Sequence, residues 1–156
     1  MGRRTIIARS DGNPVFRAQI ENLYVEAMVL ADEAYGCFAV GRGLSGAPGE
    51  AAERVALACE SLKTTTRLMH VIAWLLHQRA LLAGEPGASR QDSAARLGEV
   101  LGSDAAMCMR FDPAVQRIVS DSERLFDRVS RLDAQWQTAL MRTPVQAMLG
   151  ELRARL

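Results

Sequence analysis

The chain has 156 residues, of which 49% are hydrophobic, which is enough for one domain with an apolar core and too few for two domains of ordinary size. Its 19 basic and 18 acidic residues nearly cancel to a net charge of +1, which argues against binding to nucleic acid or to an anionic membrane surface. Widely spaced cysteines without a Cys-x-x-Cys pair, and the lack of an apolar run of about 18 residues, predict a cytoplasmic protein without disulfides, structural zinc or a membrane-spanning helix.

Hydrophobic residues recur three and four positions apart and never alternate strictly, so the pattern predicts helices and no strands. We expect a first helix over residues 14–40, followed by a Gly-rich turn over 41–49. A second helix is expected over residues 50–82, and it ends at the Gly- and Pro-containing stretch 84–87.

The second half of the chain predicts a shorter, weakly amphipathic helix over residues 89–102 and a third main helix over 113–141. The third helix starts with Asp112 as its N-cap and Pro113 at its first position. A second Thr-Pro start signal predicts a separate amphipathic segment over residues 143–156.

Long helices joined by short turns pack as antiparallel neighbours. The predicted fold class is therefore all-α: an antiparallel three-helix bundle over residues 14–142, with a short extra helix before the third main helix. Residues 1–13 are expected to form an N-terminal tail, and residues 143–156 a C-terminal amphipathic segment.

Each main helix has an apolar stripe that is predicted to face the core. On the first helix the stripe is Phe16, Ile20, Leu23, Ala27, Leu30, Ala34 and Cys37. On the third helix it is Val115, Ile118, Val119, Ser122, Leu125, Phe126, Val129, Leu132, Trp136 and Leu140. On the second helix we assign Leu62, Met69, Ile72 and Leu76 to the core.

The first two helices have more apolar surface than these stripes account for. Second stripes lie beside the first ones, through Tyr24, Met28, Ala31 and Tyr35 on the first helix and through Leu68, Val71, Leu75 and Leu82 on the second. The chain's own connecting segments could cover them, or a second copy could cover them across a two-fold axis. Because large apolar patches are rare on soluble monomers, we favour a homodimer.

Both histidines, His70 and His77, lie in the polar sector of the second helix. They are about 10.5 Å apart along the helix, too far for one metal ion, and His70 lacks the Lys-Gly that typically follows the histidine of phosphotransfer domains. We expect solvated surface histidines, and no catalytic, metal or cofactor site. Trp74 lies in the same sector; it is either covered by the chain after Gly84 or exposed as an interaction hot spot.

The second helix resembles a known family. Thr65-Thr-Arg-Leu-Met69, Trp74-Leu-Leu76 and Gln78-Arg-Ala80 are similar to the hallmark segment of the alphaproteobacterial regulator of CtrA degradation (RcdA) family. Residues 121–133 are similar to that family's third helix, and order and spacing agree over roughly residues 16–133.

This resemblance implies a homodimeric three-helix bundle that acts as a non-enzymatic adaptor. Such an adaptor helps the ClpXP protease to degrade cell-cycle regulators such as CtrA, together with CpdR-like and PopA-like proteins, at the cell pole. The sequence departs from the family over residues 143–156, where members often have a flexible tail. The alternatives are a structural or assembly dimer without a proteolytic role, and a histidine phosphotransfer module.

The residues expected to contact a dimer mate or partner combine the second stripes with the matched positions of the second helix. They are Thr64, Arg67, Leu68, Val71, Trp74, Leu75, Gln78, Tyr24, Met28 and Tyr35.

Overall fold

The computed structural model describes residues 14–41, 50–90 and 92–154. Three long α-helices dominate it: α1 (Pro14–Gly41), α2 (Glu50–Ala83) and α4 (Pro113–Ala154). Two short helices, η2 (Ser93–Ala95) and α3 (Ala105–Cys108), lie in the segment between α2 and α4. As the periodicity predicts, the described residues are mostly helical and include no strand.

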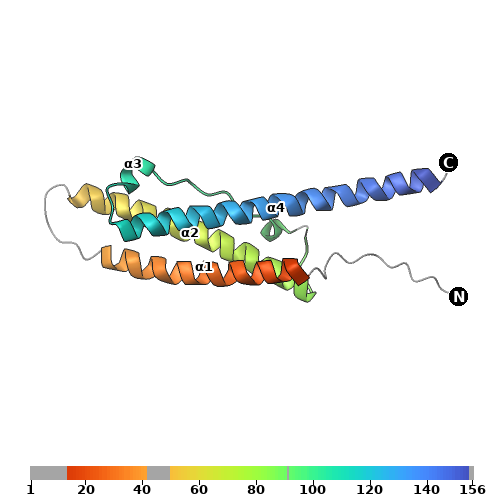
Figure 1. Cartoon of the computed structure of the whole chain (residues 1–156), viewed down its shortest axis with the longest axis horizontal. Helices are drawn as coiled ribbons and strands as arrows, with labels where there is room; N and C mark the ends of the chain where they lie inside the picture. The colour runs from red at the N-terminus through yellow and green to blue at the C-terminus, as the bar shows by residue number, and fades with distance from the viewer. Residues whose placement is uncertain (1–13, 42–49, 91, 155–156) are drawn as a thin grey trace.

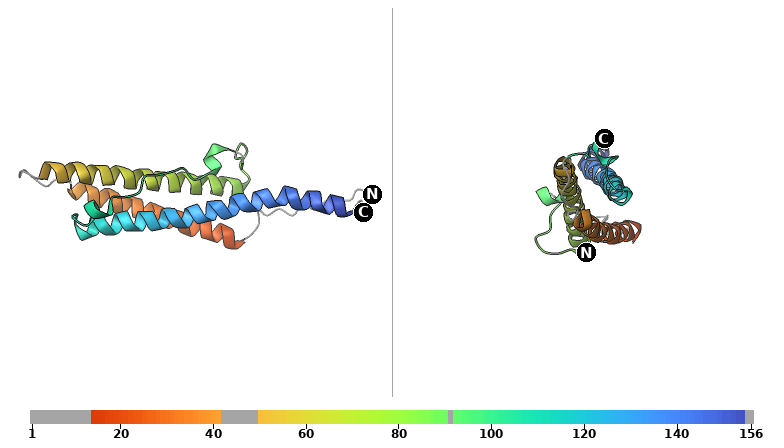
Figure 2. Two further views of the ribbon diagram at one scale, coloured as in Figure 1. Left: turned by 90° about the horizontal axis from the view of Figure 1, so that it is seen from above. Right: turned by 90° about the vertical axis from the view of Figure 1, so that its left-hand side faces the viewer.

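The long helices lie side by side, and each packs on the other two (Figures 1 and 2). The core face of α1 consists of Ile20, Leu23, Ala27, Leu30, Ala34 and Phe38, and that of α4 includes Val115, Ile118, Val119, Leu125 and Val129. These are residues of the predicted stripes, except that Phe38 is buried and its neighbour Cys37 is only half-buried. The apolar spacing therefore identifies the core faces of α1 and α4 correctly. Leu140 lies among the residues whose burial is not described.

Local sequence signals set two helix ends where they were predicted. At the start of α4, the Asp112 carboxylate accepts the Ala114 N–H at 2.9 Å, which satisfies a donor that the first turn leaves unpaired. At the end of α2, the Gly84 N–H donates to Leu81 O and the Glu85 N–H to Ala80 O, at 3.1 and 3.0 Å. This pattern is a Schellman motif, and its left-handed residue is Gly84, with φ of 69°.

Residues 89–102 do not form the predicted helix. Only η2 is helical there, and the residues from 97 to 104 have no regular secondary structure. Gly98 and Gly102 lower the helical propensity of this segment. Several of its main-chain groups instead bond to side chains of α2 and α4, as described below.

The predicted break at Thr143-Pro144 is also absent, because α4 continues to Ala154 as a single helix. Proline has a φ close to that of a helix and loses only one N–H donor, so the flanking helical turns can accommodate it at a cost. Figure 1 shows this part of α4 extending beyond the ends of α1 and α2. The tail expected over residues 1–13 lies outside the described residues.

The predicted core face of α2 is wrong. Leu62 and Met69 are 68% and 63% exposed, Leu76 is also exposed and Ile72 is half-buried. The face that packs against α1 and α4 instead contains Glu60, Thr64, Arg67, Leu68, Val71, Trp74, Leu75 and Gln78. Polar residues interrupt this face, so hydrophobicity alone selects the more continuous apolar stripe, which points outward.

None of the described helices is long and apolar enough to cross a membrane.

Candidate functional site

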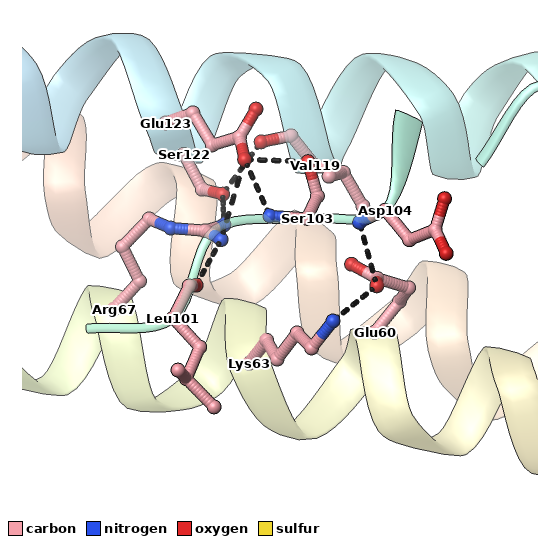
Figure 3. Close-up of polar contacts among 9 residues, drawn as sticks. All are labelled: Glu60, Lys63, Arg67, Leu101, Ser103, Asp104, Val119, Ser122 and Glu123. Carbon is pink, nitrogen blue, oxygen red and sulfur yellow. Dashed lines mark hydrogen bonds and ion pairs between the residues drawn. The ribbon is translucent and has the colours of Figure 1, made fainter. Parts of the chain in front are cut away.

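The inward face of α2 meets α4 along a line of buried and half-buried polar residues, along which the connecting segment runs (Figure 3). We call Glu60 and Arg67 of α2 with Ser122, Glu123 and Asp133 of α4 the polar seam. We call residues 97–104 of the connecting segment the strap. Each member of the seam except Ser122 bonds or pairs directly with the strap.

Arg67 lies at the centre of the seam and is only 1% exposed. Its Nη1 donates to Ser122 Oγ at 2.6 Å, and its Nη2 donates to the Leu101 carbonyl at 3.2 Å. The Glu123 carboxylate lies 3.5 Å from the same Nη2. Burial lowers the pKa of Arg67, and the charges of Glu123 and Glu60 oppose that effect. The guanidinium nevertheless stays charged, so these partners compensate for its removal from water.

Glu60 is the second buried charge of α2, and it is 2% exposed. Its Oε1 accepts from Lys63 Nζ at 2.8 Å and from the Asp104 N–H at 3.2 Å. The hydrogen bond to Glu60 raises the pKa of Lys63 despite the partial desolvation of the amine. Glu60 therefore fixes the end of the strap next to α3.

Glu123 holds the same end from the α4 side. Its Oε1 accepts both the main-chain N–H of Ser103, at 2.9 Å, and the Ser103 hydroxyl. Burial would raise the pKa of Glu123, but the two bonds from Ser103 and the charges of Arg67 and Lys63 outweigh it, so the pKa is lowered. The carboxylate is therefore stabilised in its ionised form.

Asp133 holds the other end of the strap. Its Oδ1 accepts the indole N–H of Trp74 and its Oδ2 accepts the main-chain N–H of Leu97, both at 3.1 Å. Trp74 is buried, and Leu97, in the chain after Gly84, bonds to the same carboxylate. The alternative, an exposed tryptophan at an interaction hot spot, is wrong.

The histidines of α2 are also covered by the connecting segment. His77 Nε2 lies 3.0 Å from the Ser89 carbonyl, and the ring of His70 packs against Gly98, where an added Cβ would lie 2.8 Å from Nδ1. Both rings are half-buried, so the expectation of solvated surface histidines is wrong. This position does not favour the phosphotransfer alternative, because a phosphorylated histidine must be open to its donor.

The expected contact residues on α2 lie in the interior. Their burial within one chain leaves them no surface for a partner, because they face α1, α4 and the strap. This group consists of Thr64, Arg67, Leu68, Val71, Trp74, Leu75 and Gln78, all 3% exposed or less. On α1, Tyr24 is half-buried with the Arg79 guanidinium 4.5 Å from its ring centroid, whereas Met28 and Tyr35 are exposed.

An exposed apolar surface lies on the opposite side of α2. Ala31, Tyr35, Thr65, Met69 and Ile72 line a shallow groove between α1 and α2, with a volume of about 220 Å³. We call this groove with its apolar neighbours the outer face: Tyr24, Met28, Ala31 and Tyr35 of α1 with Leu62, Thr65, Met69, Ile72 and Leu76 of α2. The residues that line the groove are uncharged, and the Arg79 guanidinium lies at the edge of the outer face, over the ring of Tyr24.

Sequence reasoning missed the carboxylates of the seam. Glu60, Glu123 and Asp133 look like ordinary surface acids on amphipathic helices, and nothing local shows that the strap crosses them. Ser122 was placed correctly on the core stripe of α4, and it is buried. Within the described ranges, no group of three or more His, Cys, Asp or Glu residues is placed to hold a metal ion.

A family model described as "Protein of unknown function (DUF1465)" matches residues 13–156. The match covers most of the chain, so the chain belongs to this family. No curated protein and no solved structure matches it.

Proposed function

We propose that this member of the DUF1465 family is a homodimeric three-helix bundle that acts as a non-enzymatic adaptor of the RcdA type. In this proposal it supports the degradation of cell-cycle regulators such as CtrA by ClpXP, together with CpdR-like and PopA-like proteins, in the cytoplasm at the cell pole. The resemblance of the segment from Thr65 to Ala80 suggests the partners. The observation that supports a binding role is the uncovered outer face.

The outer face has the composition of a buried surface. Tyr35 is 77% exposed, and Met69 and Leu62 are nearly as open. Exposed aromatic and methionine side chains are enriched in protein interfaces, and large apolar patches are uncommon on soluble monomers. A protein partner is therefore the simplest cover for this surface.

The lack of charged residues in the groove of the outer face favours a second copy as that partner. Two identical surfaces can meet across a two-fold axis without placing like charges together. The stretch from Ala58 to Ala80 is about 33 Å long, and two packed helices are roughly 18 Å wide. A symmetric pair would then bury on the order of 1,200 Å² in total, which is at the lower limit for a stable interface.

An adaptor needs no bond chemistry. Holding a substrate beside a protease raises its effective concentration, and the gain depends only on simultaneous binding. The dimer would present two copies of every remaining surface, including the part of α4 that extends beyond α1 and α2. In this proposal those surfaces bind the protease, its CpdR-like and PopA-like partners and the cargo.

The test is a reconstituted degradation assay with ClpXP, CpdR-like and PopA-like proteins and CtrA. We expect the full chain to accelerate loss of CtrA, and Met69→Glu to abolish that acceleration, because a charge on the outer face prevents dimerisation. Val25→Glu is the matched control, since Val25 is 59% exposed on α1 and lies outside the outer face. No acceleration by the wild-type chain would contradict the adaptor role and leave the assembly dimer as the alternative.

A further inference from the structure

We propose that the strap opens as a unit while the long helices stay folded, and that the seam it uncovers binds an extended segment of a partner protein through that segment's main chain. This inference does not depend on the adaptor role or on the dimer. It rests on how the strap is held.

The strap is held mainly by its backbone. Asp133 accepts the N–H of Leu97, Glu123 accepts the N–H of Ser103 and Glu60 accepts the N–H of Asp104. Arg67 donates to the Leu101 carbonyl. Contacts of this kind would hold any extended chain with the same spacing of main-chain groups, because most side chains of the bound segment take no part.

The strap contributes little apolar burial. Leu97 is half-buried against the core and Val100 is half-buried, but Leu101 is exposed, and so are Gly98, Glu99 and Gly102. Segments with few buried apolar contacts are those that open locally, at a free energy well below that of global unfolding.

Opening also returns charge to water. Arg67 and Glu60 are almost completely buried, which costs free energy that their partners only partly restore. Several of those partners belong to the strap or lie beneath it. Rehydration of the two charges therefore offsets part of the loss of the strap's hydrogen bonds, and the open seam would present a cation and carboxylates to an incoming backbone.

Two positions limit which segments fit. At Gly98 a Cβ would lie 2.8 Å from Nδ1 and 2.9 Å from Cε1 of His70, so any residue other than glycine would have to displace this ring. At Ser103 the side-chain hydroxyl also donates to Glu123. The geometry therefore selects an extended segment with glycine followed five residues later by serine.

Gly98 also gives a way to open the strap selectively. Its φ is not in the left-handed region, so alanine is strained there only by the contact with His70. We expect Gly98→Ala to speed amide hydrogen exchange at Leu97, Ser103 and Asp104 by about tenfold or more, with exchange in the middle of α2 and α4 unchanged. The double variant Gly98→Ala/His70→Ala removes the clash and should restore slow exchange. Equal acceleration in the strap and the helices would overturn the proposal.

The groove itself is tested with a fluorescent synthetic peptide of residues 96–105 and the full-length protein. In the wild type the tethered strap competes at high effective concentration, so we expect little binding. Gly98→Ala should bind the peptide at least about tenfold more tightly, and a peptide with alanine in place of the serine should bind more weakly. If Gly98→Ala opens the strap by hydrogen exchange but binds neither peptide, the seam is not a binding groove.

Discussion

The two faces of α2 reverse the usual relation between polarity and burial. The inward face contains two charged residues, Glu60 and Arg67, which are almost fully buried, whereas the outer face is apolar and its Leu62 and Met69 are largely exposed. The inward charges are matched by the connecting segment and by α4. The outer face has no such cover within the described residues. A helix face can therefore be interior although it contains charges, where other segments pair with them, and exterior although it is apolar.

The largest expected loss of stability comes from removing the Arg67 side chain at the centre of the inward face. Arg67→Ala removes the donor to Ser122 and Leu101 and leaves Glu60 and Glu123 without the guanidinium, so we expect a loss of about 3 kcal/mol in the free energy of unfolding. Urea denaturation followed by circular dichroism measures it. Arg124→Ala is the control, because Arg124 is largely exposed and pairs with Asp121 at the surface, and such pairs contribute little. Equal stability of both variants would contradict the role of the seam.

A smaller loss of stability is expected when either tryptophan is replaced by phenylalanine, and the loss should differ between the two positions. Trp74→Phe removes the N–H that Asp133 accepts, and we expect a loss of about 1–2 kcal/mol in unfolding free energy. Trp136 Nε1 has no acceptor among the described residues, and its ring stacks on Phe16 at 4.5 Å. Trp136→Phe should therefore cost less. Unfolding of the two variants in parallel makes the comparison, and a larger loss at Trp136 would count against the hydrogen bond to Asp133.

The smallest effect is a dependence of stability on pH. Because the pKa of Glu123 is lowered below its ordinary value of 4.5, its ionised form favours the folded chain. Its contribution is complete above pH 4.5 and is lost as the pH falls through the lowered pKa. We expect the difference in stability between wild type and Glu123→Gln to shrink over that range in denaturant titrations. A difference that grows with acid would contradict the contact with Ser103.

The sequence predicts those parts of the fold that depend on neighbours in the chain. Asp112 and Gly84 mark helix ends because a cap and a left-handed turn need only adjacent residues. The core faces of α1 and α4 follow from apolar spacing, since neither helix buries a charge. Three features could not be read in this way: the core face of α2, the path of the strap and the uninterrupted α4.

The failures at α2 and at the strap have a common cause. The burial of Glu60 and Arg67 depends on Leu101, Asp104 and Ser122, which lie more than 30 residues away and reach α2 only in the folded chain. A polar residue on a helix is therefore predicted to be exposed when its distant partner is not known. The opposite error occurs at the outer face. Its apolar stripe on α2 is predicted to lie in the core, but it lies on the surface.

The most direct test of the account compares two adjacent leucines of α2. Leu75 is 0% exposed on the inward face and Leu76 is 45% exposed on the outer face. In urea unfolding at a protein concentration low enough for monomers to dominate, we expect Leu75→Ala to lose about 2–4 kcal/mol and Leu76→Ala less than about 1 kcal/mol. A larger loss at Leu76 than at Leu75 would contradict the assignment of the two faces.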